Sequence, residues 1–134
     1  MSAPQPKSVL HLEDDKDDQQ MLKEVLTSIN PDLHIHTAGS GDEGWNLLQH
    51  LRSSDRLPHL VIVDLNMPGM DGKQFIKKVK SDDVFTPIPL VIFTTSSSPM
   101  DRLFAESVGV KLFTKPLSEP EFFESVKVIV KDLL

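Results

Sequence analysis

The sequence of 134 residues contains no cysteine and no tyrosine, and only one tryptophan. Without cysteine the chain forms no disulfide, no thiolate nucleophile and no cysteine-ligated metal site. It also lacks any run near the roughly 20 apolar residues that a membrane-spanning helix needs. The segment from Met1 to Ser8 is polar and contains proline, unlike a secretory signal peptide. These absences favour a soluble cytoplasmic protein.

Positive charge is also scarce, because 14 Lys and Arg stand against 20 Asp and Glu, for a formal net charge of −6. This balance argues against nucleic acid or an anionic membrane surface as the main partner. The apolar and charged fractions, 39% and 25%, are ordinary for a globular protein. The length suits one domain with a sizeable core.

Short apolar runs alternate with longer amphipathic stretches, which is typical of βα units in a parallel sheet. The third run is apolar throughout, as a buried central strand should be. The predicted strands cover residues 9–12, 33–37, 60–63, 90–93 and 111–114.

A helix is expected after each strand, because apolar residues recur there at helical spacing between capping and terminating residues. The expected helices follow Asp15, Ser40, Asp71, Ser98 and Ser118. Five βα units fill residues 8–134, so the sequence predicts a single α/β domain with no output domain. Residues 1–7 are expected to be disordered or extended.

Four of the predicted strands end in polar residues capable of chemistry. These are Glu13 and Asp14 after the first strand, Asp64 after the third, Thr94 after the fourth and Lys115 after the fifth. Ligands of an open parallel α/β sheet bind beyond the carboxyl ends of its strands, so we expect these side chains to form one cluster. The carboxylates would repel one another without a hard cation. Mg²⁺ suits such a site, since it takes one or two carboxylates, keeps several waters and pairs with phosphate.

Each of these residues also has a purely structural explanation. Acidic residues at the start of a helix complement its dipole, so residues 13–18 could form a capping cluster. Asp64 could be a loop residue or an N-cap, Thr94 a capping hydroxyl and Lys115 an exposed charge. All these explanations would have to hold together at four strand ends, and this coincidence favours a shared site.

Three segments resemble the receiver domain of two-component response regulators. They are Leu-Glu-Asp-Asp at 12–15, Val-Asp-Leu-Asn-Met-Pro-Gly-Met-Asp-Gly at 63–72, which is the most specific, and Thr-Lys-Pro at 114–116. The resemblance runs from about residue 8 to the final helix. It implies a flavodoxin-like (βα)5 fold, with a five-stranded parallel sheet in the order 2-1-3-4-5 and helices on both faces. It also implies a stand-alone, CheY-like single-domain response regulator.

The resemblance implies that Asp64 accepts a phosphoryl group from a histidine kinase or a phosphotransfer protein. Asp14 and Asp64 would ligate Mg²⁺ directly, with Mn²⁺ as an alternative ion. Glu13 would act through a water, and Asn66 through its backbone carbonyl. Such a protein is not an enzyme in the usual sense, since it promotes only its own phosphotransfer and a slow autodephosphorylation.

The resemblance also assigns the phosphoryl contacts and the switch. Lys115 would lie against the phosphoryl oxygens, and its bond to Pro116 would be cis. Thr94 would hydrogen-bond the phosphoryl group and move toward it. The family usually has an aromatic residue three positions before the lysine, where this chain has Leu112. Phe113 is a poor substitute, because alternation along a strand aims it at the opposite face.

Asn66, Thr95 and Ser96 occupy positions that, by the same resemblance, tune dephosphorylation. Thr95 and Ser96 otherwise read as part of a polar loop. The segments at 66–68 and 94–96 are similar to those of stand-alone receivers paired with sensor kinases, including phytochrome-type kinases.

Three other functions compete with this interpretation of the sequence. A metal-dependent phosphatase of the haloacid dehalogenase type needs a second Asp two residues after the nucleophile, where this chain has Asn66. A binding module could keep the fold without phosphorylation, and Leu112 is the only hint of it. A nucleotide-binding flavodoxin-like protein would need a glycine-rich loop after the first strand, and this loop is acidic.

The last expected helix carries Phe123, Val130 and Leu134 beside its inward face, which indicates either a surface for a downstream partner or a homodimer, or ordinary packing within the domain. His34 and His36 share one face of a predicted strand, either as a metal pair or as a polar face. His11 lies in an apolar strand and is expected to be a core residue.

Overall fold

The computed structural model describes residues 6–67, 69–95 and 98–134. All five predicted strands are present, with their ends within one residue of the expected positions, and each is followed by a helix. Most of the 1–7 segment lies outside the described residues. The elements are β1 Ser8–Leu12, α1 Lys16–Ile29, β2 His34–Ala38, α2 Gly41–Ser53, β3 Leu60–Val63, α3 Gly72–Lys80, β4 Leu90–Thr94, α4 Pro99–Val108, β5 Lys111–Thr114 and α5 Glu119–Leu133.

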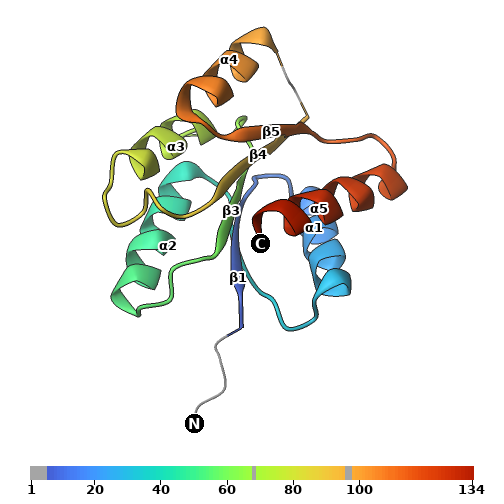
Figure 1. Ribbon diagram of the computed structural model, residues 1–134, viewed down its shortest axis with the longest axis horizontal. Helices are drawn as coiled ribbons and strands as arrows, with labels where there is room; N and C mark the ends of the chain where they lie inside the picture. Colours follow the sequence, from blue (N-terminus) through green and yellow to red (C-terminus); the bar gives the residue numbers. More distant parts are fainter. Residues whose placement is uncertain (1–5, 68, 96–97) are drawn as a thin grey trace.

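The strands form one parallel sheet in the order β2-β1-β3-β4-β5. Helices α1 and α5 cover one face, and α2, α3 and α4 cover the other (Figure 1). This arrangement confirms the predicted flavodoxin-like fold.

Alternate residues of the central strands enter two separate cores, because successive side chains of a strand point to opposite faces. Val9, Ile62 and Phe93 pack with α1 and α5, whereas Leu10, Val63 and Ile92 pack with α2, α3 and α4. Strands β1, β3 and β4 are buried along their whole length. Both faces of these strands must therefore be apolar, which explains the continuous hydrophobic runs in the sequence.

Every helix begins at an N-cap residue whose side chain accepts a hydrogen bond from a backbone N–H in the first turn, as predicted for Ser40 and Asp71. The caps are Asp15, Ser40, Asp71, Ser98 and Ser118. Such a cap contributes about 1 kcal/mol to stability. Helix α4 ends at Gly109, whose φ of 68° places it in the left-handed region that favours glycine.

One expectation about the backbone is wrong. No peptide bond among the described residues is cis, so the Lys115–Pro116 bond is trans. Trans is the commoner form of an X–Pro bond. Lys115 reaches the carboxyl edge of the sheet with this geometry.

No helix within the described part of the chain is long and apolar enough to span a membrane.

His11 is a buried residue of β1, as expected, and its side chain is 3% exposed. Burial, with a smaller contribution from the positive charge of Lys115, lowers the pKa of His11 from 6.5 to about 3. The negative charge of Asp64 opposes this change. The imidazole is therefore neutral in the folded protein at neutral pH.

The free energy of unfolding should fall at acidic pH because of His11. The unfolded chain takes up a proton at this residue near pH 6.5, but the folded chain does so only near pH 3. Stability is therefore lost as the pH falls through this window, by at most about 1.4 kcal/mol per pH unit. In metal-free buffer, urea unfolding of the wild type and of His11→Leu should give free energies of unfolding whose difference shifts steadily in favour of the variant below pH 6.5. Parallel pH profiles for the two proteins would contradict the assignment.

Candidate functional site

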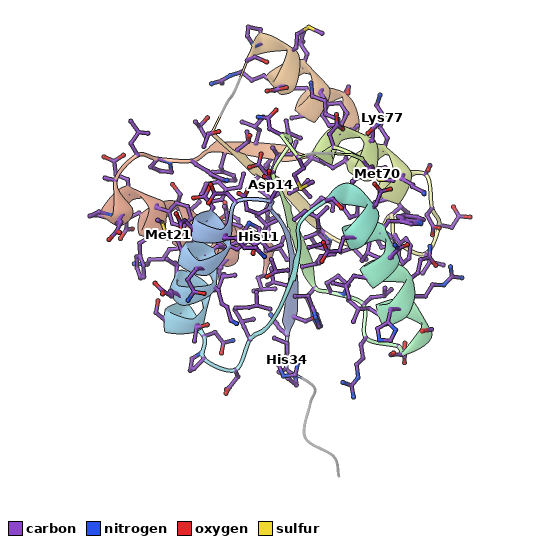
Figure 2. The ribbon with its side chains drawn as sticks, turned by 180° about the vertical axis from the view of Figure 1, so that it is seen from behind. His11, Asp14, Met21, His34, Met70 and Lys77 are labelled. Carbon is purple, nitrogen blue, oxygen red and sulfur yellow. The ribbon has the colours of Figure 1, made fainter. Side chains whose placement is uncertain are left out.

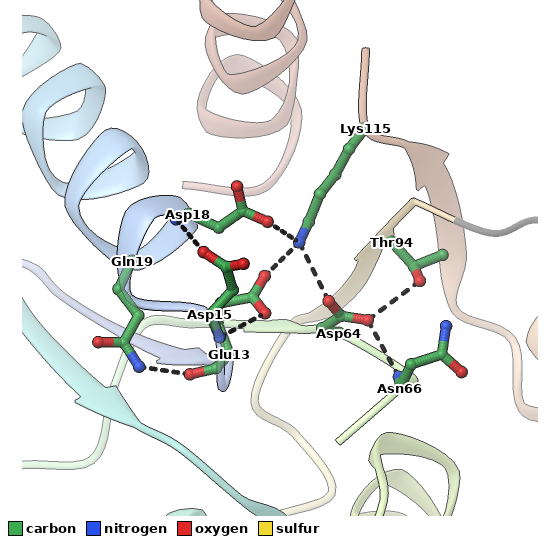
Figure 3. Close-up of polar contacts among 8 residues, drawn as sticks. All are labelled: Glu13, Asp15, Asp18, Gln19, Asp64, Asn66, Thr94 and Lys115. Carbon is green, nitrogen blue, oxygen red and sulfur yellow. Dashed lines mark hydrogen bonds and ion pairs between the residues drawn. The ribbon is translucent and has the colours of Figure 1, made fainter. Parts of the chain in front are cut away.

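The parallel sheet brings the ends of four strands to one edge. The backbone N–H of Asp64 donates to the carbonyl of Leu12 at 3.0 Å, so β3 ends beside β1. The backbone N–H of Lys115 donates to the carbonyl of Thr94 at 2.8 Å, so β5 ends beside β4. Of the five side chains predicted to meet here, Glu13, Asp64, Thr94 and Lys115 are connected by hydrogen bonds (Figure 3), whereas Asp14 is exposed.

The ammonium of Lys115 lies among three carboxylates (Figure 3). Its Nζ donates to Oδ2 of Asp64 and to Oδ2 of Asp18, each at 3.0 Å, and to Oε1 of Glu13. Lys115 comes from the end of β5, Glu13 from the end of β1 and Asp18 from α1. The Lys115 side chain thus connects the end of β5 with the end of β1, with α1 and with Asp64 after β3.

Asp64 is held from several directions. Its Oδ1 accepts hydrogen bonds from the hydroxyl of Thr94 and the backbone N–H of Asn66, each at 3.0 Å. Its Oδ2 accepts from Lys115. Asp64 is 6% exposed and Thr94 is fully buried. These contacts fix the carboxylate with one edge toward the lysine and the other toward the threonine.

Burial and charge act against each other in this pocket. Burial raises the pKa of Glu13 to about 7, and the hydrogen bond from Lys115 opposes this rise. Burial alone would lower the pKa of Lys115, but the hydrogen bond with Glu13 and the charge of Asp64 raise it above its ordinary value. Lys115 therefore stays protonated, and burial opposes the ionisation of Glu13.

The donor set fits a hard divalent cation in its chemistry. Around Lys115, one positive group faces three carboxylates, which leaves an excess of two formal negative charges. Carboxylate oxygens are the ligands that Mg²⁺ and similar ions prefer. Among the described residues, however, no three His, Asp or Glu side chains are placed to hold an ion as they stand. Glu13 and Asp64 turn toward Lys115 instead, and Asp14 is exposed.

The remaining predicted residues are less tightly placed. Thr95 is exposed, and Ser96 lies outside the described residues. Leu112 packs against the core on the side of α2, α3 and α4, and Phe113 packs on the side of α1 and α5. The expected opposite orientation of Leu112 and Phe113 is thus observed, while the switch role of Leu112 stays a prediction.

Sequence reasoning missed two contributors to the site. Asp18 binds Lys115, and the side-chain amide of Gln19 donates to the backbone carbonyl of Glu13 (Figure 3). Both lie in the first turns of α1, where an acidic residue is expected for the helix dipole alone. Asp18 differs from an ordinary acidic residue of a first helical turn only because the end of β5 brings Lys115 within reach of its carboxylate.

The histidine pair lies far from this pocket. His34 and Asp14 are at opposite ends of the sheet (Figure 2). His34 and His36 line a hollow with His50 and His59. No group of three candidate metal ligands occurs there among the described residues, and the role of the histidine pair stays a prediction.

Two glycines allow the loop after Asp64 to fold closely against its surroundings. A Cβ at Gly72 would collide with the backbone carbonyl oxygen of Asp64, and one at Gly41 would lie 2.5 Å from the carbonyl oxygen of Met70. The N–H of Gly41 donates to that same oxygen of Met70 at 2.8 Å. Backbone packing therefore positions the segment that begins with the central carboxylate.

A parallel α/β sheet that gathers carboxylates and a lysine at its carboxyl edge has the ligand-binding edge of a flavodoxin-like protein. The comparison with known families is more specific. Residues 9–127 match the response regulator receiver domain. The chain belongs to this family of two-component signalling proteins.

Curated relatives include two response regulators of Synechocystis sp. The chain is 32% identical to Rre1 over 130 residues, which cover 97% of this chain and 52% of Rre1. It thus spans about half the length of that relative. It is 30% identical to Rcp1, over 92% of this chain and 86% of Rcp1.

Two solved structures have the same fold over nearly the whole chain. The phosphorylated cyanobacterial phytochrome response regulator RcpA is 27% identical, with a TM-score of 0.89, over 96% of this chain and 94% of RcpA. The Mn²⁺-bound form of Rcp1 is 28% identical, with a TM-score of 0.84, over 92% of this chain and 91% of Rcp1.

The close backbone contact at Gly72 predicts a cost for any added side chain. Gly72→Ala should displace the Asp64 carbonyl and lower the free energy of unfolding by roughly 1–3 kcal/mol. Gly39→Ala is the matched control, because its Cβ would lie 3.5 Å from the Glu43 carboxylate, an ordinary contact. Urea unfolding of both variants tests this expectation. Equal stabilities for the two variants would show that the loop adapts without cost.

Proposed function

We propose that this receiver domain is phosphorylated on Asp64 and signals through the resulting change in its contacts with other proteins. The observation that carries the proposal is the setting of Asp64, whose buried carboxylate lies between the ammonium of Lys115 and the hydroxyl of Thr94. Both groups can donate hydrogen bonds to phosphoryl oxygens. The family match and the phosphorylated structure of the relative RcpA support it.

In the proposed reaction, a carboxylate oxygen of Asp64 attacks the phosphorus of a phosphohistidine. The new P–O bond forms as the P–N bond breaks, and the electron pair of that bond returns to the imidazole nitrogen. The attacking and transferred groups are both negative, so their approach needs positive charge nearby. Lys115 supplies one such charge, 3.0 Å from Oδ2 of Asp64.

A divalent cation, Mg²⁺ with Mn²⁺ as the alternative, belongs to the proposal. Asp14, Asp64 and the backbone carbonyl of Asn66 would hold it directly, and Glu13 through a water. When bound, it would offset the charge of the phosphoryl oxygens. The excess of negative charge around Lys115 supports this part of the proposal, as does the Mn²⁺-bound structure of Rcp1.

Thr94 and Leu112 would form the switch. The Thr94 hydroxyl donates to Oδ1 of Asp64 and would transfer this hydrogen bond to a phosphoryl oxygen. Leu112, in place of the family's usual aromatic residue, would respond by repacking against the core that it already contacts. Asn66 and Thr95, with Ser96, would set the lifetime of the phosphoryl group.

The phosphatase alternative is disfavoured at one position. Two residues after Asp64, a haloacid dehalogenase-type enzyme needs a carboxylic acid that transfers protons. Here Asn66 is exposed, and its amide cannot serve as an acid or base. The domain would therefore promote only its own phosphotransfer and a slow autodephosphorylation.

The proposed partners are proteins. A sensor histidine kinase or a phosphotransfer protein would supply the phosphoryl group in the cytoplasm, and a downstream target would read it. The likeness to RcpA, a phytochrome response regulator, favours a kinase of the phytochrome type. The acidic composition argues against nucleic acid as a target, because the phosphate backbone is also negative.

Phosphoryl uptake tests the central claim. With Mg²⁺ and acetyl phosphate, intact-mass spectrometry should show the addition of one phosphoryl group, because Lys115 and the cation offset the repulsion at Asp64. Asp64→Asn and excess EDTA should each abolish the addition, whereas the exposed control Asp83→Asn should retain it. A metal-loaded, folded wild type that takes up no phosphoryl group would overturn the proposal. Sustained turnover of many phosphate esters would instead establish a phosphatase.

Self-association through α5 is the second prediction of this proposal. Phe123 and Val130 line a groove against Ile29 of α1, and Val128 beside them is 45% exposed. A second copy would cover this apolar strip. Sedimentation velocity should then show a dimer when beryllofluoride and Mg²⁺ are added. Val128→Lys should prevent the dimer and the exposed control Val84→Lys should not, while a wild type that stays monomeric would refute dimerisation.

A further inference from the structure

Asp18 has a contact that neither the sequence pattern nor the proposed function accounts for. Its Oδ2 lies 3.0 Å from Nζ of Lys115, although the two residues are 97 positions apart in the chain. The side chain of Lys115 is 5% exposed and that of Asp18 is 29% exposed. The contact connects the first turn of α1 to the end of β5 at the rim of the pocket (Figure 3).

Helix capping does not explain where the Asp18 carboxylate lies. The backbone N–H of Asp18 donates to the N-cap Asp15 at 3.0 Å, which makes Asp18 the third residue of the helix. A side chain at this position commonly accepts a hydrogen bond from the N–H of the cap residue, as Oε1 of Gln74 accepts from the N–H of Asp71 in α3. In α1 the N–H of Asp15 donates to Oε2 of Glu13 instead, at 3.3 Å. The carboxylate of Asp18 is thereby left to reach Lys115.

An ammonium group has three N–H donors and no acceptor. Here the three acceptors of Lys115 are Glu13, Asp18 and Asp64. Glu13 and Asp18 fix two of the three N–H directions, so the third must point at Asp64. The orientation of the ammonium toward the central carboxylate thus depends on Asp18, which lies outside the expected phosphoryl and metal contacts.

We infer that Asp18 is a positioning residue for phosphotransfer, which acts by holding the Lys115 ammonium with one N–H directed at the phosphoryl group on Asp64. The inference rests on the proposed phosphorylation of Asp64. Phosphorylation replaces one acceptor at Asp64 by another and leaves the contact with Asp18 in place. Glu13 would also contact the expected cation through a water. Asp18 is therefore the carboxylate whose only proposed role is to hold Lys115.

The first test is the rate of phosphoryl uptake from acetyl phosphate at saturating Mg²⁺, followed by intact mass. Asp18→Ala should lower this rate by about fivefold, the size of a charged hydrogen bond reduced for partial exposure. Asp17→Ala is the matched control, because Asp17 is an exposed acid in the same helical turn and should change the rate by less than about twofold. Asp18→Glu keeps the charge and should recover most of the rate.

The second test does not depend on phosphorylation. In nitrogen-15 NMR of the metal-free protein, the ammonium signal of Lys115 should be sharp and slow to exchange its hydrogens. Asp18→Ala should broaden or abolish this signal, while Asp17→Ala should preserve it. Circular dichroism establishes whether each variant is folded. If Asp18→Ala is unfolded, Asp18→Asn replaces it in both tests.

The two tests separate the two claims. A wild type that takes up no phosphoryl group would refute the proposed function, and the ammonium signal would still judge whether Asp18 holds Lys115. Normal uptake at Asp64, combined with rates and ammonium signals that are the same in the Asp18 and Asp17 variants, would overturn the inference. Slower uptake with a lost ammonium signal in the Asp18 variants alone would support it.

Discussion

The contact between one ammonium and the carboxylates around it is the interaction on which the site depends. Two unit charges about 4 Å apart near a protein surface interact by about 4 kcal/mol, so bare carboxylates at this edge would repel one another strongly. Lys115 offsets that repulsion by donating to Glu13, Asp18 and Asp64 at once. The compensation is incomplete, because one ammonium faces three carboxylates. The remaining negative charge would attract a divalent cation, and that cation would in turn offset the repulsion between these carboxylates and an incoming phosphoryl group.

The fold creates this concentration of charge by simple means. Parallel strands carry their carboxyl ends to the same edge, and hydrogen bonds such as that from Asp64 to Leu12 fix the relative height of neighbouring ends. Glycine then allows backbone to approach backbone, since a side chain at Gly72 would displace the carbonyl of Asp64. Capping aims the first turn of α1 at the pocket through Asp15. Each of these contacts stabilises the fold, and each also positions a residue of the site.

Much of the fold could be predicted because its determinants are local. Hydrophobic runs located the strands to within about one residue. Apolar residues at helical spacing located the helices that follow them. The strand order came from the family resemblance, since periodicity does not specify which strands are neighbours. Glu13, Asp64, Thr94 and Lys115 were found because they follow strands. Asp18 was not found, because an acid in a first helical turn is ordinary and its partner lies 97 residues away.

The inward position of Thr94 constrains how a signal would leave the site. Its hydroxyl already donates to Asp64 and its side chain is fully buried, so phosphorylation would exchange a hydrogen-bond acceptor rather than draw the residue in from solvent. A ligand shifts a conformational equilibrium only by its differential interaction with the two states. In the proposed switch the difference would therefore lie in the repacking of Leu112 and in what Thr94 is attached to, which is the chain leading into α4. That helix is tied to α3 by the ion pair between Lys73 and Asp101 at 2.8 Å, and it presents Met100 and Leu103 at 70% and 61% exposure. A small movement at Thr94 would thus be expressed as a change in how α4 presents this apolar surface.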